Sequence, residues 1–207
     1  IYNFRQNDLK NGGQGAPLTP IFHKILKNKI NVKKVTFINI GGIINITTIL
    51  DDGYFHAYDI GPGMSFIDKW MRTNSKKKYD TNGNIAKSGK VIETVLNQYS
   101  IPDKKSYDIS DFDISFVKGL SLEDGAATLV ELTVQILAQE LVNSMERLTP
   151  DHKLILCGGG RKNSFLVERI RKYLPIAELI DNFGIDGDFV ESQAFAYLAI
   201  RSYLKLP

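Results

Sequence analysis

The stretch VTFINIGGIINITTIL, residues 35 to 50, decides the fold of this 207-residue chain. It is rich in β-branched residues, and Gly41 and Gly42 interrupt it at its centre. This pattern predicts two strands joined at a tight glycine turn, whose tip a ligand can approach closely. A third strand is expected over Tyr54 to Asp59, where apolar and polar residues alternate, with a break at the IGPG that follows.

The segment after the third strand predicts helices separated by polar loops. Apolar spacing favours a short helix over residues 65 to 71, and the sequence RTNSKKKYDTNGN, residues 72 to 84, is typical of a surface loop. A helix is expected around residues 87 to 98, followed by a loop over 100 to 120.

The last third of the chain predicts one long helix and a strand-loop-helix unit. Ser121 and Asp124 have the spacing of an N-cap and its N3 partner, and apolar periodicity extends the helix to about Arg147. The apolar KLILC, residues 153 to 157, leads into three glycines and then a helical pattern, and a final helix is expected to begin near Asp188. Together these elements predict the α/β class, and no internal repeat is visible.

Composition narrows the class of protein. With 43% hydrophobic residues the chain can bury one large core, and a formal net charge of only +3 does not favour a nucleic-acid partner. The single cysteine, Cys157, cannot form an internal disulfide, which suits a reducing compartment such as the cytoplasm. No apolar run approaching about 18 to 20 residues is evident, so no membrane span is expected.

Two glycine-rich turns are candidate nucleotide contacts. In CGGGRKN, residues 157 to 163, the glycines after a strand and before a helix would let phosphate or ribose approach the backbone, and the residues concerned are Gly158, Gly159, Gly160 and Asn163. An ordinary tight turn without a ligand explains the spacing equally well. In NIGGIINIT, residues 39 to 47, Asn39 and Asn45 flank Gly41 and Gly42, which allows a phosphate contact or a plain hairpin turn.

Carboxylates supply candidate catalytic groups. Asp8 lies on an expected loop between Arg5 and Lys10, where it could act as a general base or simply be a solvated turn residue. Asp59 precedes the GPG break and is a weaker candidate. Glu191 follows Asp188 by three residues, the spacing of a capping box, so a structural role explains it adequately.

Other reactive residue types form no pattern. His23, His56 and His152 lack metal-ligand spacing, and Cys157 has no evident base partner, so neither a metal cluster nor a thiol nucleophile is assigned. The lysines at 76 to 78 are expected in a solvated loop.

In combination the motifs are far more specific. In order, FRxxDxxxGGQGAPLTPxFH, NIGGIxNIT, DxGPG, SLEDGAATLxELT, CGGGRxN and GIDGDxxESxAFAYLA resemble the C-terminal half of the anhydro-N-acetylmuramic acid kinases. These are sugar kinases of the actin-like, hexokinase-like ATPase superfamily. The resemblance covers nearly the whole chain and implies that residues 1 to 207 form the second lobe of an actin-like ATPase (ribonuclease H-like), a mixed sheet with flanking helices.

The resemblance implies an activity and a role for each candidate residue. Family members open the 1,6-anhydro ring of the sugar with water and phosphorylate the freed O6 from ATP with a magnesium ion, giving N-acetylmuramic acid 6-phosphate in peptidoglycan recycling. By resemblance, Asp8 is the base that activates the water, Glu191 lies near the active site, and Arg5 and Asp59 bind the sugar. The resemblance also makes NIGGIINIT the second phosphate loop and CGGGRKN the adenosine loop, whereas no metal ligand can be named.

The chain departs from the family pattern in ways that bear on activity. The family's first phosphate loop, of the Gly-Thr-Ser-x-Asp-Gly type, is absent from these residues. Ile60 and Met64 replace a threonine and an asparagine, and Ile109 stands where related sequences commonly carry arginine. The sequence therefore leaves open a split kinase whose first lobe is a separate polypeptide, a homodimer, and an inactive nucleotide-binding or interaction remnant.

Overall fold

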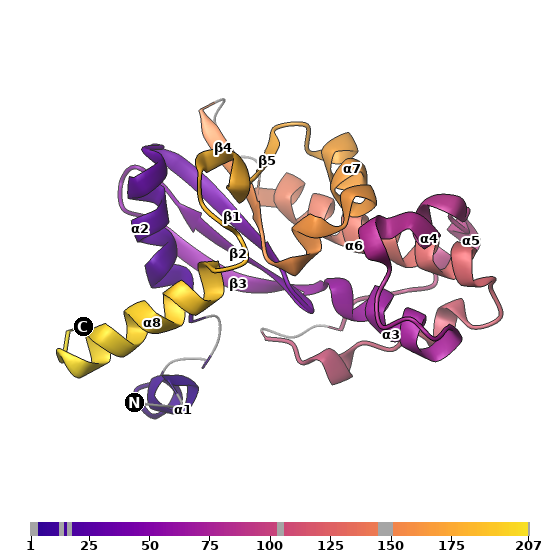
Figure 1. Ribbon diagram of the computed structural model, residues 1–207, viewed down its shortest axis with the longest axis horizontal. Helices are drawn as coiled ribbons and strands as arrows, with labels where there is room; N and C mark the ends of the chain where they lie inside the picture. Colours follow the sequence, from indigo (N-terminus) through magenta and orange to yellow (C-terminus); the bar gives the residue numbers. More distant parts are fainter. Residues whose placement is uncertain (1–3, 13–14, 16–17, 103–105, 145–150, 207) are drawn as a thin grey trace.

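A five-stranded mixed sheet organises the computed structural model, which describes residues 4–12, 15, 18–102, 106–144 and 151–206 (Figure 1). Its strands are β1 (Lys34–Ile40), β2 (Ile43–Ile49), β3 (Phe55–Pro62), β4 (His152–Cys157) and β5 (Ala177–Leu179). Their order is β3-β2-β1-β4-β5, with β1, β2 and β3 antiparallel to one another and β1, β4 and β5 parallel. This confirms the expected α/β class with a mixed sheet and flanking helices.

The glycine hairpin forms as predicted. β1 and β2 pair in register, with Asn39 opposite Asn45, and Gly41 and Gly42 make the turn. The third strand is longer than expected: β3 continues through the predicted break to Pro62. A bulge allows this, since Asn45 pairs with Asp59 while its neighbour Ile44 pairs with Gly61, leaving one extra residue on β3.

Alternation along the strands produces two cores, one on each face of the sheet. Ile38, Ile40 and Leu156 belong to the larger core, and Phe37 and Ile155 belong to the smaller one. Side chains of successive strand residues point to opposite faces, so runs of apolar residues are buried on both sides.

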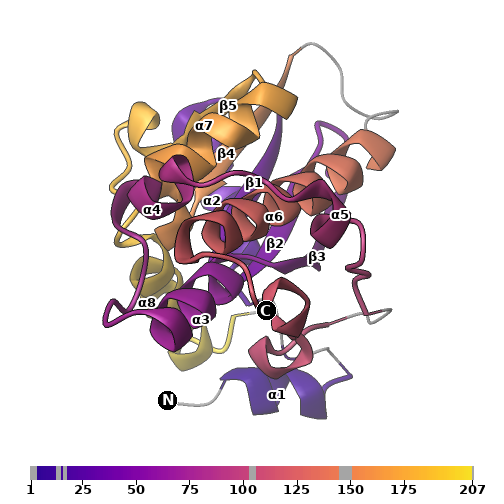
Figure 2. The same cartoon turned by 90° about the vertical axis from the view of Figure 1, so that its right-hand side faces the viewer.

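Helices from the middle of the chain cover the larger core. Figure 2 shows the long α6 lying across the sheet among its neighbours. The helices of this layer are α3 (Met64–Asn74), α4 (Asn84–Ser88), α5 (Glu93–Leu96), α6 (Leu122–Ser144) and α7 (Ser164–Tyr173), and α7 connects β4 to β5. The predicted cap of α6 is confirmed, because the Asp124 N–H donates to Ser121 Oγ at 3.0 Å. The predicted end of this helix at Arg147 lies outside the described residues.

Helix α6 bears on the expectation that the chain contains no membrane span. Among the described helices, it has the length and apolar composition of a spanning helix over Leu122–Val142. However, 72% of its apolar window is buried inside the molecule, which is what a core helix shows.

The helix expected over residues 87 to 98 is wrong as a single element. It is divided into α4 and α5, with Gly89 between them. Gly89 has an extended backbone, with φ of −91° and ψ of 174°, which ends α4. A Cβ atom on Gly89 would lie 2.1 Å from the carbonyl oxygen of Glu123, so only glycine fits beside the start of α6. The loop expected over 72 to 84 is also shorter, since α3 extends to Asn74 and a 3₁₀ turn, η1, spans Thr81–Gly83.

Three helices lie on the other side of the molecule. α2 (Pro20–Ile30), which the sequence pattern did not predict, covers the smaller core, and α8 (Val190–Tyr203) projects from the sheet as the expected final helix (Figure 1). α1 (Phe4–Lys10) lies beside α8, where the Phe4 and Phe195 rings are 6.2 Å apart. Asp8 is therefore in a helix, and the expected loop at this position is wrong.

Candidate active site

Two cavities of similar size meet at the turn after β4. The first, about 500 Å³, is lined by Asp59, Glu191 and Arg5 and is called here the carboxylate cavity. The second, about 530 Å³, is lined by Gly41, Gly42, Gly160, Asn163 and Asp68 and is called the glycine cavity. Gly159 and Lys162 line both. Two ligands bound here would thus have adjoining ends.

The turn between the cavities is a short 3₁₀ helix, η5 (Gly159–Lys162). Gly158 has φ of +78°, and a Cβ there would lie 2.6 Å from Asn39 Oδ1. A Cβ on Gly160 would lie 2.3 Å from Ile40 Cγ2, whereas nothing lies within 4 Å of one on Gly159. Packing against β1 therefore explains Gly158 and Gly160, and Gly159 is the glycine whose open surface faces both cavities.

Asn163 links this turn to α7 and retains bonding capacity. Its Oδ1 accepts the N–H of Leu166 at 3.0 Å and caps the helix. The residue is only 4% exposed, and its Nδ2 is buried without a hydrogen-bond partner. Because a buried unpaired donor is costly, this atom is suited to donating to a ligand in the glycine cavity.

The far wall of the glycine cavity comes from residues that sequence patterns did not single out. Asp68, on α3, has a buried Oδ1 without a partner, and burial, opposed by the nearby Arg72, raises the pKa of this carboxyl group. The segment Tyr79 to Asn82 completes the wall. It is held by Asp80, whose two carboxylate oxygens accept the N–H groups of Ile85 and Ala86 at 3.0 and 2.9 Å.

The carboxylate cavity gathers three of the predicted substrate and catalytic residues. Asp59 accepts hydrogen bonds from Ser106 Oγ at 3.1 Å and from the Tyr107 N–H at 3.2 Å, which fix its carboxylate at the cavity wall. Glu191 reaches the wall from the first turn of α8, and Arg5 reaches it from α1. Asn39, Asn45 and Gly158 also line this cavity, so the predicted cofactor residues are divided between the two cavities.

His23 is a further residue of the carboxylate cavity that the sequence did not assign. Its ring stacks on Phe37 with centroids 4.8 Å apart, and its Nδ1 lies 2.8 Å from Thr47 Oγ1. Burial lowers the pKa of this imidazole to about 4, so the ring is neutral at pH 7.

Asp8 lines neither cavity. Its Oδ2 accepts the Gly15 N–H at 2.7 Å. It follows Arg5 by three residues in α1, which places the two side chains on neighbouring positions of one helix face. Arg5 lines the carboxylate cavity, so Asp8 is within one helical turn of it.

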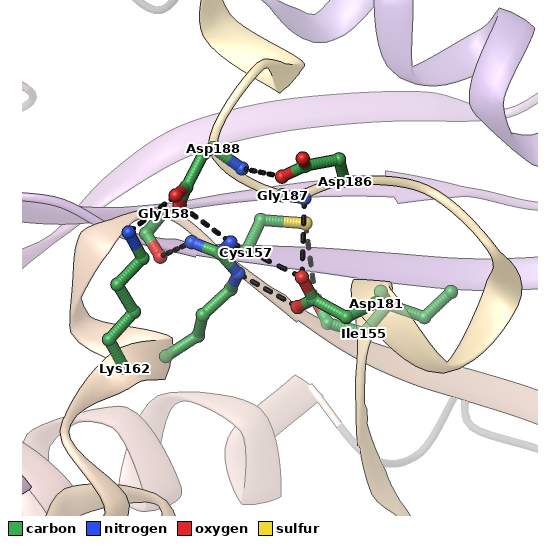
Figure 3. Close-up of polar contacts among 9 residues, drawn as sticks. Ile155, Cys157, Gly158, Lys162, Asp181, Asp186, Gly187 and Asp188 are labelled. Atoms are coloured by element: carbon green, nitrogen blue, oxygen red, sulfur yellow. Dashed lines mark hydrogen bonds and ion pairs between the residues drawn. The ribbon is translucent and has the colours of Figure 1, made fainter.

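The predicted capping box at the start of α8 is absent. The N-cap of α8 is Phe189, without a side-chain bond, and the Asp188 carboxylate instead binds Arg161 Nη2 at 2.7 Å and Lys162 Nζ at 2.5 Å (Figure 3). Lys162, and then Arg161, hold the pKa of Asp188 below its usual range. The structural explanation offered for Glu191 therefore fails, and its side chain lines the cavity instead.

Arg161 ties the turn after β4 to the segment before α8. Its Nε donates to Asp181 Oδ2 at 2.8 Å and its Nη1 to the Gly158 carbonyl at 3.1 Å. Figure 3 shows Asp181, Gly187 and Asp188 around this point. The Arg161 side chain is only 6% exposed, so these bonds fix the shape of the shared wall.

Neither thiol nor metal chemistry is supported by the described part of the chain. Cys157 is buried, and burial, only partly opposed by Arg161, raises the pKa of its thiol to about 12. Within the described ranges, no three His, Cys, Asp or Glu side chains form a metal-binding group. A nucleotide fits the glycine turns and the unpaired Asn163 donor, whereas these residues do not by themselves hold a metal ion.

The fold is an α/β fold built on a mixed five-stranded sheet, and the paired cavities form a candidate nucleotide site. The family model for anhydro-N-acetylmuramic acid kinase matches residues 1–207, and the chain belongs to that family. It is 48% identical to the anhydro-N-acetylmuramic acid kinase of Pelagibacter ubique (strain HTCC1062), covering 99% of this chain and 58% of that protein. The corresponding kinases of Methylobacterium nodulans and Pasteurella multocida are 38% and 37% identical, over the whole chain and 57% and 58% of their own lengths.

The chain thus spans somewhat more than half the length of the curated relatives it matches. Solved structures show a more distant likeness. An activator of 2-hydroxyisocaproyl-CoA dehydratase from Clostridium difficile, with bound ADPNP, matches with a TM-score of 0.42 and 11% identity, over 81% of this chain and 63% of that one. The ethanolamine utilization protein EutJ from Carboxydothermus hydrogenoformans matches with a TM-score of 0.41 and 11% identity, over 74% and 46%.

Proposed function

We propose that this chain is the sugar- and nucleotide-binding second lobe of a cytoplasmic, ATP-dependent anhydro-N-acetylmuramic acid kinase. The observation that carries the proposal is the junction of the two cavities at Gly159 and Lys162. A phosphoryl donor in one cavity and an acceptor in the other would meet there, and phosphoryl transfer depends chiefly on such positioning.

We assign the nucleotide to the glycine cavity. Gly41, Gly42 and Gly160 leave room for a ligand close to the backbone, and Asn163 Nδ2 offers an unpaired donor. Asp68 offers an unpaired acceptor on the opposite wall. ATP supplies the transferred phosphoryl group, and a magnesium ion would be bound mainly by its phosphates and water, so no step is assigned to a metal ligand of this chain.

We assign the anhydro sugar to the carboxylate cavity. Arg5 and Asp59 offer a donor and an acceptor for its polar groups. In the proposed reaction a water oxygen bonds to the anomeric carbon as the bond from that carbon to O6 breaks, and O6 takes the terminal phosphoryl group of ATP, releasing ADP. Asp8, near Arg5 on α1, accepts the proton of the water, and Glu191 lies on the cavity wall.

The experiment is phosphate transfer from ATP to 1,6-anhydro-N-acetylmuramic acid, with product identified by ³¹P NMR. The chain is assayed alone and with the part of the Pelagibacter ubique relative that it does not cover, added as a separate polypeptide. We expect turnover to require the added part, because its absence leaves the phosphoryl donor incompletely enclosed. Asp8→Asn should abolish turnover without changing nucleotide affinity.

Glu191→Gln serves as the comparison for Asp8→Asn, since it removes a carboxylate that lines the cavity directly. Bound nucleotide without transfer in any mixture would contradict the kinase assignment and favour a non-catalytic binding role. Full turnover by Asp8→Asn would remove that residue as the base.

A further inference from the structure

Lys162 occupies a place that nothing assigned so far uses. It is the last residue of η5 and lines both cavities. Among the described residues that line the glycine cavity, it carries the one cationic side chain. The phosphate chain of a nucleotide held there would carry several negative charges toward the junction that Lys162 lines.

The neighbouring cation cannot serve the same purpose. Arg161 uses Nε, Nη1 and Nη2 for Asp181, the Gly158 carbonyl and Asp188, and its side chain is 6% exposed. A Cβ on Gly187 would lie 2.2 Å from Arg161 Nε, so the guanidinium fills the space beside this glycine. Arg161 is a fixed part of the wall.

Lys162 is held far less firmly. Its side chain is 60% exposed, and its Nζ makes an ion pair with Asp188 Oδ2 at 2.5 Å, drawn in Figure 3. An exposed ion pair of this kind contributes little to stability, because water screens both charges. The four-carbon stem is flexible, so the ammonium group can change partner without moving the backbone.

Asp188 does not become an isolated charge if Lys162 leaves. Its Oδ1 still binds Arg161 Nη2 at 2.7 Å, and its backbone N–H donates to Asp186 Oδ1 at 3.0 Å. Both Lys162 and Arg161 lower the pKa of Asp188, and Arg161 remains in place. The exchange therefore costs little, and a polyphosphate offers more negative charge than the single carboxylate.

We propose that Lys162 is a phosphate-binding residue that exchanges Asp188 for the phosphate chain of the nucleotide at the junction of the two cavities. The proposal deepens the proposed function and rests on it for the identity of the nucleotide. Asp188 is the partner that Lys162 leaves for the phosphate chain, while Arg161 keeps the turn in shape.

The test measures the affinity of the purified chain for adenosine, ADP, ATP and inorganic tripolyphosphate by isothermal titration calorimetry. Lys162→Gln is compared with Lys162→Arg, which keeps the charge, and with Lys172→Gln. Lys172 is a matched control, because it lies on α7 outside both cavities, is 54% exposed, and pairs with Glu168 at 3.9 Å. Circular dichroism and thermal unfolding verify that the variants are folded.

We expect Lys162→Gln to bind ATP and tripolyphosphate at least tenfold more weakly, in line with the loss of one charge-assisted hydrogen bond. Its affinity for adenosine should be unchanged, and Lys172→Gln and Lys162→Arg should resemble the wild type. Wild-type affinity of Lys162→Gln for both phosphate ligands would overturn the proposal while leaving the nucleotide site intact.

The two proposals fail in different ways. One outcome is that tripolyphosphate binding depends on Lys162, adenosine does not bind, and ATP binds no more tightly than tripolyphosphate. This outcome would support the role of Lys162 and contradict the nucleotide assignment. Failure of the wild type to bind either tripolyphosphate or ATP would overturn both.

Discussion

Gly160 contacts Ile40 so closely that a Cβ atom on Gly160 would lie 2.3 Å from Cγ2 of Ile40. The contact joins the turn after β4 to the end of β1, beside the hairpin turn of Gly41 and Gly42. It therefore holds the two glycine turns next to each other along one wall of the glycine cavity.

A matched pair of alanine substitutions separates packing from binding at this turn. We expect Gly160→Ala to lower the free energy of unfolding by about 1 to 3 kcal/mol, because the methyl group overpacks Ile40. Gly159→Ala should change it by less than about 0.5 kcal/mol, since nothing lies within 4 Å of its Cβ, yet it should weaken nucleotide binding. Urea unfolding and calorimetry measure the two effects, and equal destabilisation by both would contradict the assignment.

Asp68→Asn is expected to increase the stability of the chain and to weaken its affinity for nucleotide. The Asp68 carboxylate has a buried unpaired oxygen and a raised pKa, so its ionised form is destabilising at pH 7. The neutral amide should increase the free energy of unfolding, by on the order of 1 kcal/mol. It should also weaken nucleotide binding several-fold if Asp68 accepts a hydrogen bond from the nucleotide.

Asp52→Asn is the control for Asp68, because Asp52 is exposed and accepts only the local Tyr54 N–H among the bonds described for it, which asparagine can also accept. Thermal unfolding and calorimetry of both variants are compared. Unchanged nucleotide affinity in Asp68→Asn would remove Asp68 from the binding wall.

Stability should fall on acidification through the buried histidines. The pKa of His23 is about 4 in the folded chain and roughly 6.5 when unfolded, so the unfolded state binds the proton first. Stability is therefore complete above about pH 6.5 and is lost as the pH falls toward 4. His152, whose pKa is also lowered to about 4 by burial and then by Lys34, contributes in the same direction.

Urea unfolding at pH 7 and pH 5 tests this account of His23. We expect His23→Gln to reduce the loss of stability between these pH values by about 2 kcal/mol. The same substitution at the exposed His56 is the control for the general effect of replacing a histidine by glutamine. An identical pH dependence in wild type and His23→Gln would contradict the neutral, buried state of this ring.

Arg161→Lys should behave as a disruptive change despite keeping the charge. A lysine cannot reach Asp181, Asp188 and the Gly158 carbonyl together, since these bonds use the planar guanidinium. We expect a loss of about 2 kcal/mol in the free energy of unfolding and weaker nucleotide binding. Lys162→Arg, one residue away, should keep wild-type stability, and a comparable loss there would indicate a general sensitivity of the turn.

Local sequence patterns correctly predicted the elements whose structure is determined by interactions between neighbouring residues. The hairpin at Gly41 and Gly42 and the Ser121 cap of α6 were predicted correctly, because turn and cap chemistry depend on adjacent residues. The helix expected over 87 to 98 is interrupted at Gly89, which is extended and lies against the backbone of Glu123, a residue remote in sequence. The three-residue strand β5 is too short to show a periodic pattern.

Site residues that belong to local motifs could be predicted from the sequence. Site residues that distant segments bring together could not. The glycine turns and Asn163 were recognised from sequence, and the structure places them along the two joined cavities. The far wall from Asp68 and Tyr79 to Asn82 carries no motif, because distant segments bring it to the site. The capping box of Asp188 was wrong because Arg161 and Lys162 bind that carboxylate in preference to the helix start.

The most direct test of the account is ¹H–¹⁵N NMR of the labelled chain titrated with ADP. We predict saturable shifts of the amides at Gly41, Gly42 and Gly158 to Asn163, together with those near Asp68 and Asn82, and little change on α2. Absence of saturable shifts at both glycine turns, or shifts confined to other surfaces, would contradict the assignment of the glycine cavity to a nucleotide.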